Sequence, residues 1–271
     1  MYFIYGRKKL MKKRAMAAVS AVMCASMVLS ACGSSASTST TAAPAETKAA
    51  EETKAEETTA AAASGDVVTI NIGFENTTEE PIGQAVEKWA ELLKEESNGT
   101  MELKVFANSA LGNKSKLIDQ MVMGENVITI ADGAFYADYG VPDLGILYGP
   151  FFFDNWDEVW KLIDSDWYKD QCSKLADKGL TVLGSNWIYG ERELMTKDKA
   201  VVPADIKGKK IRLANSQIYV EGFNALGATA VPMALGDVYT ALQNGTLDGV
   251  ENPLSTLYGQ SFQEVTKNIL M

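Results

Sequence analysis

The chain has 271 residues, and 46% of them are apolar, which is enough for one large domain or two smaller ones with a real core. Its formal net charge of −10 combines 25 basic and 35 acidic residues. Nucleic-acid binding needs clustered lysine and arginine against phosphates, so this acidic balance predicts no nucleic-acid partner. The sequence contains no histidine, which excludes Ser-His-Asp and Cys-His catalysis and histidine-ligated zinc.

The three cysteines are Cys24, Cys32 and Cys172, and two of them lie near the N-terminus. The part expected to fold therefore holds one cysteine, so an internal disulfide cannot form there. A cysteine cluster for a metal is excluded in the same way. We expect no metal site and no cofactor.

The N-terminus has the pattern of an export signal. Basic residues up to Arg14 precede an apolar run at 15–28, and Leu29-Ser30-Ala31-Cys32-Gly33 follows. This order predicts a signal peptide over residues 1–31, and the short run, interrupted by serine, disfavours a permanent span. Leu-Ser-Ala-Cys also resembles the lipobox of bacterial lipoproteins, which implies that Cys32 is lipidated and becomes the new N-terminus. The alternative is ordinary cleavage beside an incidental cysteine.

Residues 32–65 have the composition of a tether. The segment is rich first in Ser, Thr and Ala and then in Glu, Lys, Thr and Ala, without an aromatic or large aliphatic residue. It cannot bury enough apolar surface to offset the cost of ordering, so it is predicted to be disordered. Together with Cys32 it predicts an exported protein, lipid-anchored at the extracytoplasmic face of the cell membrane.

From Asp66 onward the pattern is that of a folded α/β protein. Alternating apolar residues predict strands at 67–74 and 101–105, and further strands are predicted at 127–131, 180–187 and 210–213. Apolar residues at spacings of three and four predict helices from Pro81 to about Gly99, at 114–124, about 156–163, at 216–226 and 236–244. The β-α-β-α-β order at the start predicts α/β layers on a mainly parallel sheet.

Several polar side chains follow predicted strands. Ligands of doubly wound sheets bind outside the carboxyl ends of strands, and Glu75, Asp132 and Arg192 fall at such ends. Each has a plainer interpretation: the two acids suit turns or helix caps, and an isolated arginine suits the surface. We expect the aromatic residues Phe135, Trp187 and 151–153 to be packing residues, and Cys172 to be an unactivated thiol.

The second half carries motifs that occur together in one family. They are Asp205-Ile206-Lys207-Gly208-Lys209-Lys210-Ile211-Arg212-Leu213, Val231-Pro232-Met233, Asp237-Val238-Tyr239-Thr240-Ala241-Leu242-Gln243-Asn244-Gly245 and Glu251-Asn252-Pro253, with Val105-Phe106-Ala107-Asn108-Ser109-Ala110-Leu111-Gly112 and Gly190-Glu191-Arg192 upstream. Their order resembles the solute-binding proteins of TRAP transporters, the DctP type, and the resemblance covers 66–271. Any one of these pieces alone would be weak evidence.

The resemblance implies the fold class: α/β, with two lobes joined at a hinge, similar to type II (Venus-flytrap) periplasmic binding proteins. It places lobe I at 66–189 and lobe II at 190–271. Members of the family continue with further strands and helices, so the resemblance also implies a chain truncated at its C-terminus and a fold incomplete there.

The resemblance implies a ligand site as well. Arg212 would pair with the ligand carboxylate, for which a guanidinium offers two matched donors, and Arg192 and Asn252 would be further contacts. Glu75 and Asp132 fall at positions that vary with the ligand. Taken alone, Arg212 would be a solvated arginine on a strand, and Asn252 would shape a turn.

The function implied is that of the extracytoplasmic solute-binding component of a TRAP-type secondary transporter, a monomer that delivers a small organic acid to membrane subunits. Two arginines with two acids favour a sugar acid such as a hexuronate, with a C4-dicarboxylate as the alternative. Ala107, Glu80 and Leu235 depart from common family residues, which leaves the ligand open. A ligand-sensing lipoprotein for a sensor kinase is a second alternative. A hydrolase is disfavoured by the absence of histidine and of a Gly-x-Ser-x-Gly elbow.

Overall fold

The structure is a computed structural model that describes residues 2–6 and 66–271, with side chains in the second range. The predicted lipidation site Cys32, the predicted tether and most of the predicted signal peptide lie outside the described residues. No helix among the described residues is both long and apolar enough to cross a membrane.

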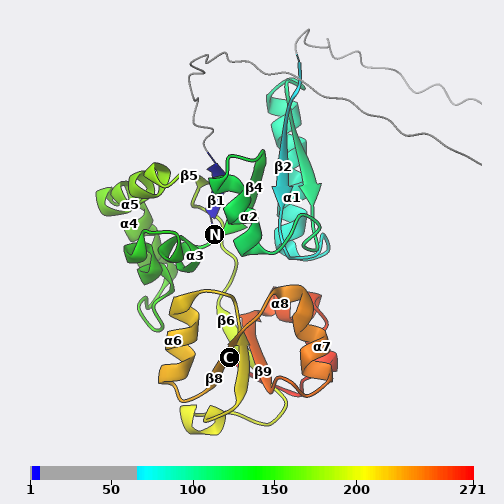
Figure 1. Cartoon of the computed structure of the whole chain (residues 1–271), viewed down its shortest axis with the longest axis vertical. Helices are drawn as coiled ribbons and strands as arrows, with labels where there is room; N and C mark the ends of the chain where they lie inside the picture. The colour runs from blue at the N-terminus through cyan, green and yellow to red at the C-terminus, as the bar shows by residue number, and fades with distance from the viewer. Residues whose placement is uncertain (1, 7–65) are drawn as a thin grey trace, which may run out of the picture. The chain divides into compact units, whose positions relative to one another are not determined.

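The described strands form two five-stranded sheets, of which sheet A comes first in the chain. Its strands are β1 (Tyr2–Gly6), β2 (Val68–Gly73), β3 (Met101–Phe106), β4 (Val127–Ala131) and β5 (Leu180–Gly184), in the order β3-β2-β4-β1-β5 (Figure 1). β2 runs parallel to β3 and β4, whereas β1 is antiparallel to β4 and β5. The expectation of a mainly parallel sheet therefore holds for the β2–β3–β4 part, and sheet A as a whole is mixed.

Strand β1 lies inside the segment predicted to be a signal peptide. Its backbone pairs with both β4 and β5, with Tyr2 opposite Ala131 and Gly6 opposite Leu180. Removal of residues 1–31 would take this strand away from the sheet. The signal peptide stays a prediction from the sequence.

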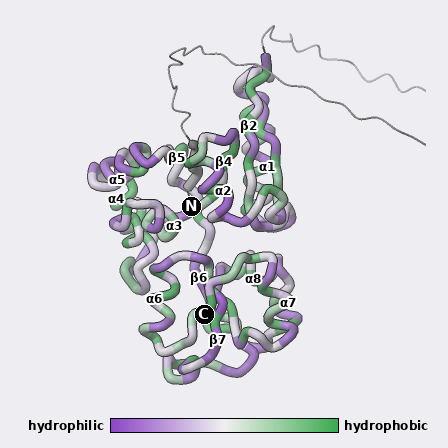
Figure 2. The backbone as a smooth tube through the Cα atoms, viewed as in Figure 1, coloured by the Kyte–Doolittle hydropathy of each residue, from purple (hydrophilic) through white to green (hydrophobic). Residues whose placement is uncertain are grey.

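The helices that accompany sheet A follow the predicted pattern closely at first. They are α1 (Pro81–Glu96), α2 (Lys114–Val122), α3 (Gly133–Asp138), the 3-10 helix η1 (Pro142–Tyr148), α4 (Trp156–Asp164) and α5 (Asp166–Asp177). Pro81 occupies the first turn of α1, where its missing N–H costs nothing. Figure 2 shows polar and apolar residues mixed along α1, and its apolar face packs with Ile72, Leu103 and Ile128 in the core.

Sheet B comes from the later part of the chain. Its strands are β6 (Arg192–Thr196), β7 (Lys210–Leu213), β8 (Thr229–Pro232), β9 (Gly249–Pro253) and β10 (Asn268–Leu270), in the order β10-β6-β9-β7-β8. β7 is parallel to β8 and β9, and β6 is antiparallel to β9 and β10. Its helices are η2 (Pro203–Ile206), α6 (Gln217–Ala225), η3 (Leu235–Asp237), α7 (Val238–Gln243), α8 (Leu254–Gly259) and η4 (Phe262–Glu264).

Two expectations were wrong. The strand expected at 180–187 ends at Gly184, the last residue of β5 that pairs with β1, and Trp187 instead packs edge-on against Trp89. Phe151 and Phe152 are not buried, since they are 94% and 53% exposed. Phe151 has a φ of +58°, a turn conformation that is rare for a bulky residue, and this turn directs it away from the core.

A buried polar network joins the loop before α1 to α8. The Nδ2 of Asn76, which carries two hydrogens, lies within hydrogen-bonding distance of three acceptors: Glu80 Oε2 at 2.7 Å, Tyr189 Oη at 3.0 Å and Thr256 Oγ1 at 3.0 Å. Gln260 Nε2 donates to Glu80 Oε1 at 2.9 Å. These five residues, called here the Asn76 network, connect segments up to 180 positions apart in sequence. Burial raises the pKa of the Tyr189 hydroxyl to about 12.

Candidate ligand-binding site

A pocket of about 200 Å³ contains Arg212. It is lined by residues that accompany sheet A and by residues of sheet B and its loops: Glu75, Asn113, Lys114, Ser115 and Phe135 from the former, and Arg212, Ala214, Asn215, Pro232, Met233 and Ala234 from the latter. Pockets for drug-sized ligands measure about 300–1,000 Å³, so this one suits a small molecule. The lining combines charged, amide and hydroxyl groups with one aromatic face.

Arg212 is buried on β7, an interior strand of sheet B, with 3% of its surface exposed. β7 lies between β8 and β9, and Ile211, Arg212 and Leu213 are all buried, so both faces of this strand are covered. Its Nε and Nη2 both donate to the carbonyl oxygen of Met233, at 2.9 and 2.6 Å. Its Nη1 is buried and has no hydrogen-bond partner among the described residues.

Burial also lowers the pKa of Arg212, because a low-dielectric environment disfavours the charged form, while Glu251 and Glu75 act in the opposite direction. An arginine remains protonated in proteins even so. A buried cation with an unused donor is costly unless an anion supplies the missing acceptor. The Arg212 environment therefore fits a bound carboxylate.

Arg192 is held by Glu251. Its Nε and Nη2 donate to the two oxygens of that carboxylate, at 2.5 and 2.8 Å. The side chains of Arg192 and Glu251 are only 18% and 4% exposed, and the guanidinium lies 4.9 Å from the centroid of the Tyr219 ring. Desolvation is the largest single influence and lowers the pKa of Arg192, but the attraction of Glu251, together with that of Tyr219 and Tyr148, exceeds it, so the pKa is raised.

The other predicted site residues are spread around this region. Glu75 lines the pocket, and its Oε1 accepts from the backbone N–H of Leu235 at 3.4 Å. Asp132 is buried at the start of α3, where Oδ1 accepts from the N–H of Ala134 at 3.1 Å, as expected of a helix cap. Asn252 is buried in β9 opposite Glu193. The structure thus brings Arg212 and Glu75 into one pocket, while Asp132 and Asn252 do not line it.

Several pocket residues were missed from the sequence. Asn113, Lys114 and Ser115 directly follow the Val105–Gly112 motif and begin α2, and Asn215 lies two residues after β7. Asn113 caps α2 by accepting from the N–H of Lys116 at 3.0 Å. The sequence signal that could have identified the first three as pocket residues is their position directly after the Val105–Gly112 motif.

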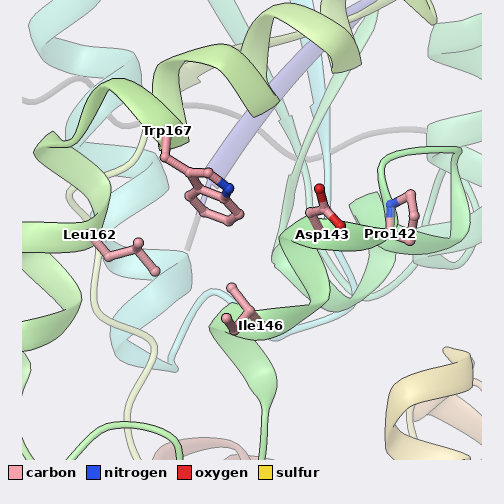
Figure 3. A pocket seen from close by; sticks show the side chains of 5 residues that line it. All are labelled: Pro142, Asp143, Ile146, Leu162 and Trp167. Carbon is pink, nitrogen blue, oxygen red and sulfur yellow. The ribbon is translucent and has the colours of Figure 1, made fainter.

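A larger hollow of about 610 Å³ lies elsewhere, between η1 and helices α4 and α5. Figure 3 shows Leu162, Ile146 and Trp167 around it, with Asp143 and Pro142 on the η1 side. Its walls are apolar apart from one acid, and no cation lines it. An organic acid therefore fits the smaller pocket better. Within 66–271, no group of three acidic or cysteine side chains is placed to hold a metal ion.

Comparison with known proteins identifies one family of solute-binding proteins. Residues 72–271 match the family described as bacterial extracellular solute-binding protein, family 7 (DctP). The chain is 32% identical over 201 residues to the 2,3-diketo-L-gulonate-binding periplasmic protein YiaO of Escherichia coli, covering 73% of this chain and 60% of the relative. It is 31% identical over 188 residues to the C4-dicarboxylate-binding periplasmic protein DctP of Rhodobacter capsulatus, covering 69% and 56%.

A solved structure is similar in the same region. The TRAP periplasmic solute-binding protein of Ochrobacterium anthropi with bound L-fuconate superimposes with a TM-score of 0.73 and 41% sequence identity, covering 75% of this chain and 67% of that one. The chain thus spans 60% and 56% of the lengths of the two relatives named above.

Proposed function

Because this chain belongs to the DctP family of bacterial extracellular solute-binding proteins, we propose that it captures a small organic acid outside the cytoplasm for the membrane subunits of a TRAP-type transporter. The proposal includes no catalytic step. The observation that carries it is Arg212, a buried cation on the wall of a small pocket with Nη1 unpartnered among the described residues. A ligand carboxylate supplies the acceptor that Nη1 lacks.

The polar lining supports a sugar acid as the ligand. Glu75 offers acceptors for hydroxyl hydrogens, and Asn113, Ser115 and Asn215 offer both donors and acceptors. Among the relatives, one is named for 2,3-diketo-L-gulonate and one structure holds L-fuconate, and both compounds are sugar acids. Another relative is named for C4-dicarboxylates, which keeps that class as the alternative.

A thermal-shift screen of the full chain tests this function. Sugar acids should raise the melting temperature, because a ligand at about 100 times its Kd stabilises the folded state by about 2.7 kcal/mol. The matched control is galactitol, which carries the hydroxyl groups of galactonate but no carboxylate. The proposed function fails if no organic acid shifts the melting temperature, or if galactitol shifts it as much as galactonate does.

We also propose that Cys32 anchors the exported protein through attached lipid. The support is the sequence Leu29-Ser30-Ala31-Cys32 after an apolar run, followed by a tether-like segment.

Changing Cys32 to alanine should move the protein from the membrane fraction to the soluble fraction or the medium, as seen by immunoblotting of fractionated cells. Cys24→Ala is the matched control, because Cys24 lies within the predicted apolar run, and it should leave the protein at the membrane. A wild-type chain that is already soluble and free of lipid by mass spectrometry would contradict the anchor.

A further inference from the structure

The pocket contains a second cation, Lys114. It is the first residue of α2 and lines the pocket from the sheet A side, whereas Arg212 lines it from sheet B. Its Nζ lies 4.8 Å from the centroid of the buried Phe135 ring, within the distance of about 6 Å over which a cation is attracted to an aromatic face. No acidic side chain among the described residues forms an ion pair with Lys114.

The other candidate for a second cation is already engaged. Two nitrogens of Arg192 are bound to both oxygens of Glu251, and Arg192 does not line the pocket. Releasing it toward a ligand would leave the buried Glu251 carboxylate without its partner, which is costly. Lys114 has three N–H donors, and it can bind a ligand without breaking an ion pair among the described residues. It is therefore the cation available to a second part of the ligand.

The charges on the pocket wall restrict what that second part is. Arg212 and Lys114 are cations and Glu75 is an anion, which gives a formal net charge of +1. A ligand with one carboxylate makes the enclosed group neutral, while a dicarboxylate leaves an uncompensated negative charge beside Glu75. Uncompensated charge is strongly unfavourable where water is excluded. Asn113 and Ser115, which flank Lys114, add an amide and a hydroxyl suited to hydroxyl oxygens.

We propose that Lys114 is a specificity-determining residue that donates to hydroxyl oxygens of a polyhydroxy monocarboxylate, at the end of the ligand remote from the carboxylate held by Arg212. Lys114 begins helix α2, which accompanies sheet A, and Arg212 lies on β7 of sheet B, so the two cations line the pocket from different elements. The inference rests on the proposed function, because it requires a carboxylate at Arg212.

Calorimetric titration of the full chain with two matched ligands tests this assignment. L-galactonate ends in a hydroxymethyl group, and galactarate carries a second carboxylate in its place on a similar polyhydroxy chain. The wild type should bind L-galactonate more tightly than galactarate. Lys114→Met keeps the approximate length of the side chain but removes its donors. It should weaken the binding of L-galactonate by about 10- to 100-fold, the range for a hydrogen bond with a charged partner.

Lys116→Met is the matched control, since Lys116 is an exposed lysine in the same first turn that does not line the pocket. It should bind L-galactonate like the wild type. A loss below threefold in Lys114→Met overturns the proposal. So does tighter wild-type binding of galactarate that disappears in Lys114→Met, because Lys114 would then serve a dicarboxylate. If wild type binds neither acid, and no other acid in the thermal-shift screen, the proposed function itself fails. Acid binding that depends on Arg212 but not on Lys114 overturns this inference alone.

Discussion

Arg212→Ala should weaken binding of the organic acid by about 30-fold or more. Removing one member of a buried, hydrogen-bonded charge pair costs roughly 2–5 kcal/mol, and each 1.4 kcal/mol corresponds to a factor of ten in Kd. Arg212 is 3% exposed and its Nη1 is the donor without a partner among the described residues. The ligand carboxylate would lose this donor together with the opposite charge. Calorimetric titration with the acid that gives the largest thermal shift measures the effect.

Two further variants separate binding from folding. Arg212→Lys keeps the charge but cannot reproduce the planar pair of donors, so its loss should be intermediate. Arg192→Ala leaves Glu251 buried without its partner, so it should chiefly lower the free energy of unfolding. Circular dichroism and a melting curve establish that each variant is folded before titration. If a folded Arg212→Ala variant binds within about threefold of wild type, under 0.7 kcal/mol, Arg212 does not hold the carboxylate.

The elements that the sequence predicted well are those with strong periodicity. The apolar residues alternate in β2 and β3, recur every three to four positions in α1 and α2, and form a short run in β4, and these elements lie within three residues of the predicted bounds. β9 was missed because it buries Glu251 and Asn252 among its five residues. Buried polar residues break the apolar pattern by which a strand is predicted. The ion pair between Glu251 and Arg192 that stabilises them forms across 59 positions, beyond the reach of local analysis.

The candidate site was also only partly predictable from the sequence. Periodicity alone placed Arg212 on a strand but predicted a solvated side chain, since it could not tell that both faces of β7 are covered. Only the surrounding family motif indicated a role in binding. Lys114 lies just beyond a family motif rather than within one, and its place in the pocket depends on how Phe135 and sheet B lie around it. Such positions follow from tertiary contacts between distant segments, which the sequence alone does not reveal.

Glu80→Ala should lower the free energy of unfolding by about 2–4 kcal/mol. Glu80 is 2% exposed, and its carboxylate accepts from Asn76 Nδ2 at 2.7 Å, Gln260 Nε2 at 2.9 Å and the N–H of Thr77 at 3.1 Å. A buried donor left without a partner costs about 1–3 kcal/mol, and Asn76 retains Tyr189 and Thr256 as alternatives. Two partly buried donors, Gln260 Nε2 and the N–H of Thr77, therefore lose their acceptor, and a loss near the low end of that range for each is still a large part of the 5–15 kcal/mol typical of a folded protein.

The close packing around Glu80 also indicates that its neighbours cannot readily move to fill the space left by Glu80→Ala. A Cβ added to Gly259 would lie 2.4 Å from Glu80 Cγ, so α8 packs directly against this side chain, and removal of the carboxylate leaves a space that rigid neighbours fill poorly. Urea unfolding of the full chain at neutral pH measures the change. Glu79→Ala is the control, because Glu79 is the exposed neighbour and should alter the unfolding free energy by less than about 0.5 kcal/mol. Glu80→Gln keeps the shape of the side chain but turns one acceptor into a donor that faces other donors. Its free energy of unfolding should therefore lie between those of Glu80→Ala and Glu79→Ala. Equal unfolding midpoints for Glu80→Ala and Glu79→Ala would mean that the Asn76 network does not stabilise the fold.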